Sequence, residues 1–304
     1  IDGTLVCLGF DADQSFVQIQ GDQQTGGNVI TAYQLLRLLL DDHLTACMVR
    51  DGDGVMAQRG RGFGNRSFGG CGGGFFGRSG LTAGCEAEQH GQNQEQGNDL
   101  LYIGFSSGLS ATYMAAKNAA EEISEKYPDR KIMVVDSLCA SLGQGLLVKL
   151  AVDKKNDGAT LEEVAEYVEK TKWNLAHWFT VEDLFFLKRG GRVSAASAVV
   201  GTMLQIKPVL HVDNEGKLIS MEKARGRQGS IKALVERMKA TAIDPAKQTV
   251  YISHGDCYDD AKKLADIIVE EFGITDILIS EIGPVIGAHA GPGTIALFFL
   301  ATER

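Results

Sequence analysis

A glycine–serine turn at residues 104–108 is the first feature whose residue types can perform chemistry. Gly104-Phe-Ser-Ser-Gly108 matches the pattern G-x-S-x-G and follows an apolar run, at a point where a strand would turn into a helix. In a hydrolase this turn presents the nucleophile, here Ser106, and His289 with Asp136 or Asp256 would complete a triad. The same turn has another interpretation, because hydroxyl and free N–H groups at a helix start bind a carboxylate or phosphate. We favour binding, with a serine esterase that uses Ser106 as the alternative.

A cationic stretch between Asp183 and Lys232 is the second feature. It holds nine Lys or Arg residues and four Asp or Glu residues, so its balance is 9 − 4 = +5 in a chain of formal charge −9. This local reversal of the electrostatic field favours an anionic ligand or an acidic partner. An ordinary solvent-exposed face can carry the same charge balance. Arg192 and Arg225 lie beside glycines, which allow a ligand to approach the backbone closely. These two arginines are therefore candidates for contacts with an anionic ligand or an acidic partner.

The histidines and cysteines predict neither a metal site nor a cofactor. His289 lies in the glycine-rich segment GAHAGPG and is the histidine that we expect to be functional, whereas we expect His177 and His211 to be core or surface residues. Six cysteines occur without CxxC pairs or nearby histidines, which argues against a zinc site and a disulfide framework. A pI near 5.2 argues against a nucleic-acid partner.

The chain from residue 98 onward alternates apolar strands with helices. Continuous apolar strands between helices are typical of a parallel sheet, and a hairpin signal at Asp213–Gly216 adds antiparallel pairing in the second half. Thr160 and Glu163 form a capping-box pattern at one helix start. We predict strands at 100–105, 131–136, 178–180, 209–212, 218–223, 248–253, 276–281 and 294–301, helices at 109–127, 145–153, 161–172, 230–240 and 259–272, and a glycine/proline loop at 283–293.

These elements predict two α/β domains, the first with a parallel sheet and the second with a mixed or antiparallel sheet. We expect the first domain at 98–172 and the second at 173–304. Residues 1–97 read as an atypical segment that is partly disordered or frame-shifted, because a glycine-rich tract at 60–80 and a polar tract at 87–97 bury no core. Within it, 29–47 carries an apolar helical pattern.

The composition predicts a soluble cytoplasmic protein. No apolar run approaches the roughly 20 residues that span a bilayer, and residues 1–14 lack the basic start of a signal peptide. Transient contact with a membrane surface stays open.

Six motifs in order resemble the DegV family of bacterial fatty-acid-binding proteins, and the resemblance covers about residues 99–299. They are FSSGLSATY (105–113), VVDSLCASLGQGLLV (134–148), FTVEDLFFLKRGGRVS (179–194), IKPVLHVDNEGKLISMEKARGR (206–227), ISHGDC (252–257) and IGPVIGAHAGPGTIALFF (282–299).

The resemblance implies a non-enzymatic carrier that buries a long-chain fatty acid between two α/β domains. By resemblance, Ser106, Ser107 and His289 hold the carboxylate, and Arg192 and Arg225 lie near the pocket mouth. It also implies a fatty-acid kinase as partner, which phosphorylates the bound acyl chain. The apolar segments 193–204 and 295–300 are suited to line an alkyl tunnel, and each buried methylene contributes roughly 0.8 kcal/mol.

Residues 1–97 depart from the family pattern. Neither the opening strand with its T-D-S-type motif nor the later Thr-Ser-Gln-type segment is recognisable there. A shifted reading frame or a chimeric join is our hypothesis for this departure.

Overall fold

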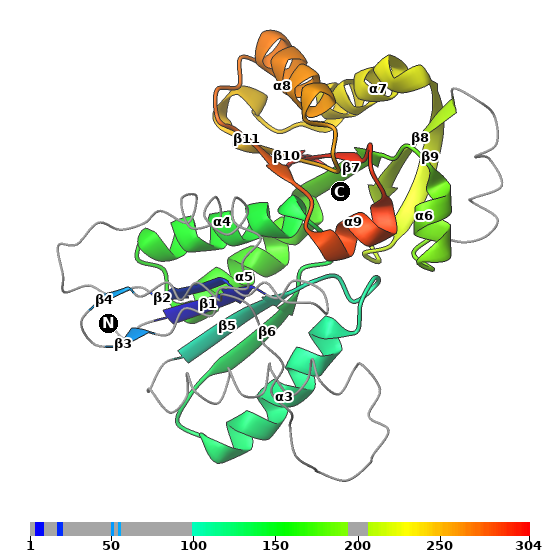
Figure 1. Cartoon of the computed structure of the whole chain (residues 1–304). Helices are drawn as coiled ribbons and strands as arrows, with labels where there is room; N and C mark the ends of the chain where they lie inside the picture. Colours follow the sequence, from blue (N-terminus) through cyan, green and yellow to red (C-terminus); the bar gives the residue numbers. More distant parts are fainter. Residues whose placement is uncertain (1–3, 9–16, 21–49, 52–53, 56–98, 194–205) are drawn as a thin grey trace.

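The computed structural model describes residues 4–8, 17–20, 50–51, 54–55, 99–193 and 206–304. They form two α/β units, each built on its own sheet (Figure 1). The predicted helical pattern at 29–47, the glycine-rich and polar tracts, and nearly all of the segment 193–204 lie outside the described residues. The α/β class and the mixed sheet of the second unit are as predicted.

The first unit has four strands in the order β2-β1-β5-β6. Strand β1 (Thr4–Leu8), β5 (Asp99–Gly104) and β6 (Ile132–Asp136) are parallel, and β2 (Val17–Gln20) is antiparallel to β1. Strand β1 is not predictable from the sequence, because its partner β5 lies about ninety residues further on and the segment between gives no recognisable pattern. A separate two-stranded pair joins β3 (Arg50–Asp51) and β4 (Gly54–Val55).

Among the described residues, three helices accompany this sheet: α3 (Thr112–Lys126), α4 (Leu142–Asn156) and α5 (Leu161–Thr171). Helix α3 begins three residues later than predicted, because the N–H groups of Leu109 and Ser110 both bond to the carbonyl of Ser106 and close a turn first. The predicted capping box is confirmed, with Thr160 and Glu163 each accepting from the other's backbone N–H. A short 3-10 helix, η1 (Lys172–Asn174), then leads into the second sheet.

The second unit has six strands in the order β11-β10-β12-β7-β8-β9. Strands β10 and β11 are parallel and the other neighbours are antiparallel. The strands are β7 (Leu175–Thr180), β8 (Ile206–Val212), β9 (Leu218–Arg225), β10 (Val250–His254), β11 (Ile277–Glu281) and β12 (Ile295–Leu300). Its helices are α6 (Leu184–Arg189), α7 (Gly226–Thr241), the 3-10 turn η3 (Pro245–Lys247), α8 (Tyr258–Phe272) and α9 (Pro284–Ala290).

Helix α9 corrects the prediction of a loop at 283–293. Pro284 stands in the first turn, where its fixed φ suits a helix and its missing N–H costs nothing. The N–H of Gly287 bonds to the carbonyl of Gly283 and that of Gly291 to the carbonyl of Gly287, so helical i→i−4 bonding extends to both ends of the segment. Gly291 then ends the helix with φ of +81°. The glycine and proline content of this segment hid a seven-residue helix that carries His289 near its end.

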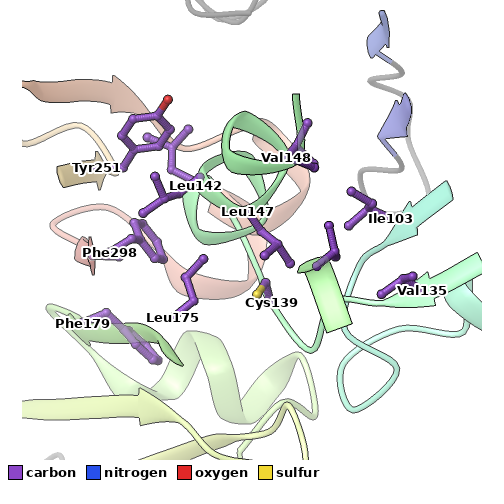
Figure 2. Packing of buried hydrophobic residues seen from close by; sticks show 14 of the residues in the cluster. Ile103, Val135, Cys139, Leu142, Leu147, Val148, Leu175, Phe179, Tyr251 and Phe298 are labelled. Carbon is purple, nitrogen blue, oxygen red and sulfur yellow. The ribbon is translucent and has the colours of Figure 1, made fainter. Parts of the chain in front are cut away.

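One hydrophobic core joins the two units through α4 (Figure 2). Leu142, Leu146 and Leu147 of this helix are buried between the first sheet, which contributes Ile103, and the second sheet, which contributes Phe298. Full burial of such a side chain contributes about 1.5–3 kcal/mol. This core is continuous between the two units and so marks no boundary between them. The predicted division of the chain at residue 172 therefore stays a prediction. Within residues 99–193 and 206–304, no helix has both the length and the apolar character that crossing a membrane requires.

Candidate functional site

A cavity lies between the two units. Its space open to the centres of water-sized groups is about 80 Å³, and one water needs about 10–15 Å³ by this measure, so the cavity holds several such groups. Its surface is almost entirely apolar. The lining residues are Phe105, Leu109, Ala140, Ser141, His177, Phe179, Leu187, Arg192, Val212, Leu218, Ser253, Ile282, Ile286, His289, Ala290, Thr294, Ala296 and Phe298.

The second sheet supplies one wall of this cavity. Ser253 of β10, Ala296 of β12 and Phe179 of β7 are opposite one another in the strand registers, and all three line the cavity. On the next row of the same face, Phe298 is opposite His177 and both line it too. Side chains two residues apart on a strand point to the same face. Thr294, which directly precedes β12, and Ala296 and Phe298 of β12 therefore form a strip of this wall.

The opposite wall comes from the first unit and from two short helices. Phe105 and Leu109 belong to the turn between β5 and α3, and Ala140 and Ser141 to the loop before α4. Helix α9 supplies Ile286 and His289. Since both units contribute, the cavity depends on how they pack together.

His177 lines the cavity as a neutral imidazole with a hydrogen bond at each ring nitrogen. Its Nδ1 bonds to the carbonyl of Leu175 at 2.9 Å, so Nδ1 carries the proton, and its Nε2 accepts from the N–H of Ala140 at 3.4 Å. Burial lowers the pKa of His177 well below its usual value, and the positive charge of Arg304 lowers it further. This histidine, expected to be core or surface, is both buried and part of the cavity wall.

Arg192 and His289 meet at the turn that follows α6. The Arg192 guanidinium donates through Nη1 to the carbonyl of Gly190 at 2.7 Å. The ring of His289 lies against the same glycine so closely that a Cβ there would be 2.2 Å from its Nδ1. Both side chains are half-buried and both line the cavity. One glycine thus brings together two nitrogen-bearing groups that suit an anion.

Ser106 and Ser107 occupy the turn that the G-x-S-x-G pattern predicts, but neither is among the cavity-lining residues. The Ser106 hydroxyl is fully buried and donates to the carbonyl of Gly216 at 2.8 Å, while accepting from the N–H of Gly108 at 3.2 Å. Ser107 is exposed, and its N–H donates to Asp136. The Ser106 proton is therefore directed at a carbonyl of the β8–β9 hairpin and not at a base.

The remaining predicted residues lie away from the cavity wall. Arg225 is exposed at the end of β9. The Asp136 carboxylate accepts from the backbone N–H groups of Ser107 and Leu138, and Asp256 is exposed. Among the described residues, no group of three or more His, Cys, Asp or Glu side chains is arranged to hold a metal ion.

Sequence reasoning missed three polar residues of the wall: Ser141, Ser253 and Thr294. Thr294 donates to the carbonyls of Ala290 and Gly291 and so closes the end of α9. Ser141 bonds to Ser253 across the two units at 3.0 Å. For Thr294 the alternation on its strand was a usable signal, whereas nothing local marks the serines.

Comparison with known proteins identifies relatives over most of the chain. A model of the DegV family, described as uncharacterised proteins, matches residues 87–302. A DegV domain-containing protein of Clostridium perfringens is 48% identical over 210 residues, which are 69% of this chain and 72% of that protein.

Solved structures share the fold. A Thermotoga maritima protein, described as revealing a fatty-acid-binding function, is 30% identical with a TM-score of 0.63, covering 72% of this chain and 75% of its own. The Streptococcus pneumoniae Fatty Acid Kinase (Fak) B3 protein, solved with linoleic acid, has a TM-score of 0.64 at 24% identity, covering 70% of this chain and 75% of its own. The extent of the family match and the identity to these relatives show that the chain belongs to the DegV family.

Proposed function

We propose that this protein binds one long-chain fatty acid in the cavity between its two units and carries it without chemical change. The observation that carries the proposal is the cavity itself, with its almost wholly apolar surface and two anion-compatible side chains at one place. The fatty-acid-binding function described for the Thermotoga maritima relative, at 30% identity, supports the same ligand class.

The alkyl chain supplies most of the affinity in this proposal. Burial of a methylene contributes roughly 0.8 kcal/mol, so a long chain gains far more than any one polar contact provides. Phe179, Ala296 and Phe298 form the apolar surface of the sheet wall against which the chain would lie. The polar groups would fix the orientation of the ligand.

We place the carboxylate at Arg192 and His289. Both line the cavity and both approach Gly190, so a carboxylate between them gains charge-assisted hydrogen bonds. By family resemblance Ser106 and Ser107 remain proposed partners of the carboxylate; they lie in the turn that supplies Phe105 and Leu109 to the wall but do not line the cavity themselves.

A fatty-acid kinase is the proposed partner, which would phosphorylate the carboxylate of the bound chain. This part rests on the family resemblance. Arg225, exposed at the end of β9, is the proposed contact for the new phosphate or for the kinase. The cationic stretch around it suits an acidic partner surface.

Denaturing mass spectrometry of an organic extract from the purified protein tests the proposal. A stoichiometric long-chain fatty acid, released unchanged, is expected. The matched variant is Ala296→Phe, which places a ring in the cavity from a residue between Ser253 and Phe179. This variant should stay folded by circular dichroism and lose the lipid. A folded wild-type protein that neither retains nor takes up a fatty acid would overturn the proposal.

A further inference from the structure

Ser141 has an unusual place in the cavity wall. It is the N-cap residue of α4, a position where serine normally accepts a hydrogen bond from the helix, yet its side chain makes no capping bond. Its backbone has φ of +54° and ψ of −142°, a region that non-glycine residues rarely adopt. Its hydroxyl bonds instead to that of Ser253, 3.0 Å away on the second sheet.

The two hydroxyls leave one proton unused. Each hydroxyl has a single donor, and one of the two is consumed in the bond between them. The other proton has no acceptor among the residues that the structure describes. Both serines line the cavity, and Ser141, half-buried where Ser253 is fully buried, is the member more accessible to a ligand.

The other polar groups of this wall are already satisfied by the backbone. His177 donates to Leu175 O and accepts from Ala140 N–H, and Thr294 donates to backbone carbonyls at the end of α9. An alkyl chain gives the spare Ser141–Ser253 proton no acceptor, whereas an oxygen atom on that chain would accept it. A buried donor without a partner is unfavourable.

The pair is separated from the proposed carboxylate position along the sheet. Ser253 is opposite Ala296, and two residues before Ala296 comes Thr294, whose hydroxyl bonds to the carbonyl of Ala290, the residue after His289 in α9. Two residues of strand span about 7 Å. With the carboxylate at the proposed position, the hydroxyl pair would face the chain of the ligand and not its head group.

We propose that Ser141, oriented by Ser253, is a specificity determinant that recognises an oxygen substituent within the acyl chain, as in a hydroxy or keto fatty acid. This inference rests on the proposed fatty-acid-binding function and names its ligand class more closely. Ser141 contacts the substituent, and Ser253 is a positioning residue.

The test compares delipidated wild type with Ser141→Ala and Ser253→Ala. The matched control is Ser280→Ala, because Ser280 is opposite Ser253 on β11 and does not line the cavity. The ligands are octadecanoic acid and octadecanoic acids with one hydroxyl group at successive mid-chain carbons. Competition binding gives the dissociation constants, and circular dichroism confirms that each variant is folded.

Wild type should prefer the hydroxylated acid at one position of the series by about fivefold, the effect of one net hydrogen bond. Ser141→Ala should abolish this preference while leaving octadecanoic acid affinity within about twofold. Ser253→Ala should reduce the preference, and Ser280→Ala should retain it.

Two results would overturn the inference alone. One is binding of octadecanoic acid with no preference at any hydroxyl position. The other is an equal loss of affinity for all ligands in Ser141→Ala, since the serine would then hold the carboxylate. Failure of folded wild type to bind any of these acids would overturn the proposed function as well, and is thus distinguishable.

Discussion

The backbone of Gly143 and the imidazole of His177 are in direct contact across the two units. A Cβ on Gly143 would lie 2.1 Å from Nε2 of His177, and 2.6 and 2.8 Å from two ring carbons. The ring is held by hydrogen bonds at both nitrogens, so it has little freedom to move aside. The close approach between the start of α4 and strand β7 therefore requires a residue without a side chain at position 143.

Gly143→Ala should destabilise the protein by about 1–3 kcal/mol, the usual cost of overpacking a core. Urea unfolding followed by circular dichroism measures the change. Gly229→Ala, in helix α7, is the control, because the nearest atom to a Cβ on Gly229 is 3.8 Å away. Alanine at this helical position should be neutral or stabilise by up to about 1 kcal/mol. Equal effects of the two substitutions would contradict the contact.

Acidification should lower the free energy of unfolding from about pH 7 downward. The pKa of His177 is lower in the folded chain than in the unfolded chain, so below pH ~6.5 the unfolded chain binds more protons. The contribution of His177 is complete above its unfolded pKa and is lost as the pH falls toward the folded pKa. The slope from this residue is at most about 1.4 kcal/mol per pH unit.

His177→Asn isolates that contribution, because an amide can replace the Nδ1–H bond to Leu175 O without titrating. Its slope between pH 7 and pH 5.5 should be smaller than that of wild type. The pKa values of His211 and His254 are also lowered, mainly by burial, so the variant should keep part of the slope. Identical slopes for wild type and variant would rule out the assignment to His177.

Gly216→Ala should separate a steric cost from a backbone cost. Gly216 has φ of +71°, and its added Cβ would lie 2.1 Å from Oγ of Ser106. Gly273 has nearly the same φ, +68°, with nothing within 4 Å of a Cβ. Gly273→Ala should cost about 1–2 kcal/mol from the backbone alone, and Gly216→Ala should cost more in the same unfolding assay.

The double variant Ser106→Ala/Gly216→Ala removes the atom that the new methyl group strikes. It should therefore be less destabilised than the sum of the two single variants, as expected for residues in contact. Strict additivity would show that Ser106 and Gly216 do not share this contact in solution.

Arg192→Gln and His289→Gln should weaken binding of a long-chain fatty acid by about 10- to 100-fold, the range of a hydrogen bond to a charged group. Octadecanol carries no charge, so its weaker binding should change little. Arg189→Gln is the matched control, because Arg189 lies over the ring of Phe186 and does not line the cavity. Parallel losses for the acid and the alcohol would argue against a carboxylate at these residues.

A reactive ester should leave Ser106 unmodified. The hydroxyl proton is directed at Gly216 O, so no base activates the oxygen. Incubation with p-nitrophenyl octanoate, followed by intact-mass measurement, should give the unmodified mass and a release of nitrophenol no faster than that of Ser106→Ala. An acyl adduct on Ser106 would favour the serine esterase alternative.

The elements with local sequence codes were predictable, and those that depend on distant partners were not. The capping box of Thr160 and Glu163 lies within four consecutive residues. The turn between β8 and β9 ends at Gly216, which adopts a positive φ. Helix α9 was missed because the glycines and prolines of the segment 283–293 are typical of a loop.

The candidate site divides in the same way. His289 and Arg192 were predicted from glycine-rich surroundings and family resemblance, and the structure brings them to one glycine. The roles of Ser106 and Ser141 depend on partners 110 and 112 residues away, Gly216 and Ser253. No spacing within the chain reveals such pairs, since the packing of one unit on the other creates them.

The shared core at α4 has a consequence for the kinetics of exchange. A carrier must release its cargo, yet pulling the units apart would expose the whole cluster around Leu142 and Leu147 to water. Helices α6 and α9 are short, contact each other and bury few side chains, so their displacement is less costly. We therefore expect the off-rate of the ligand to follow the motion of these two helices, and backbone amide exchange to be faster there than in α4.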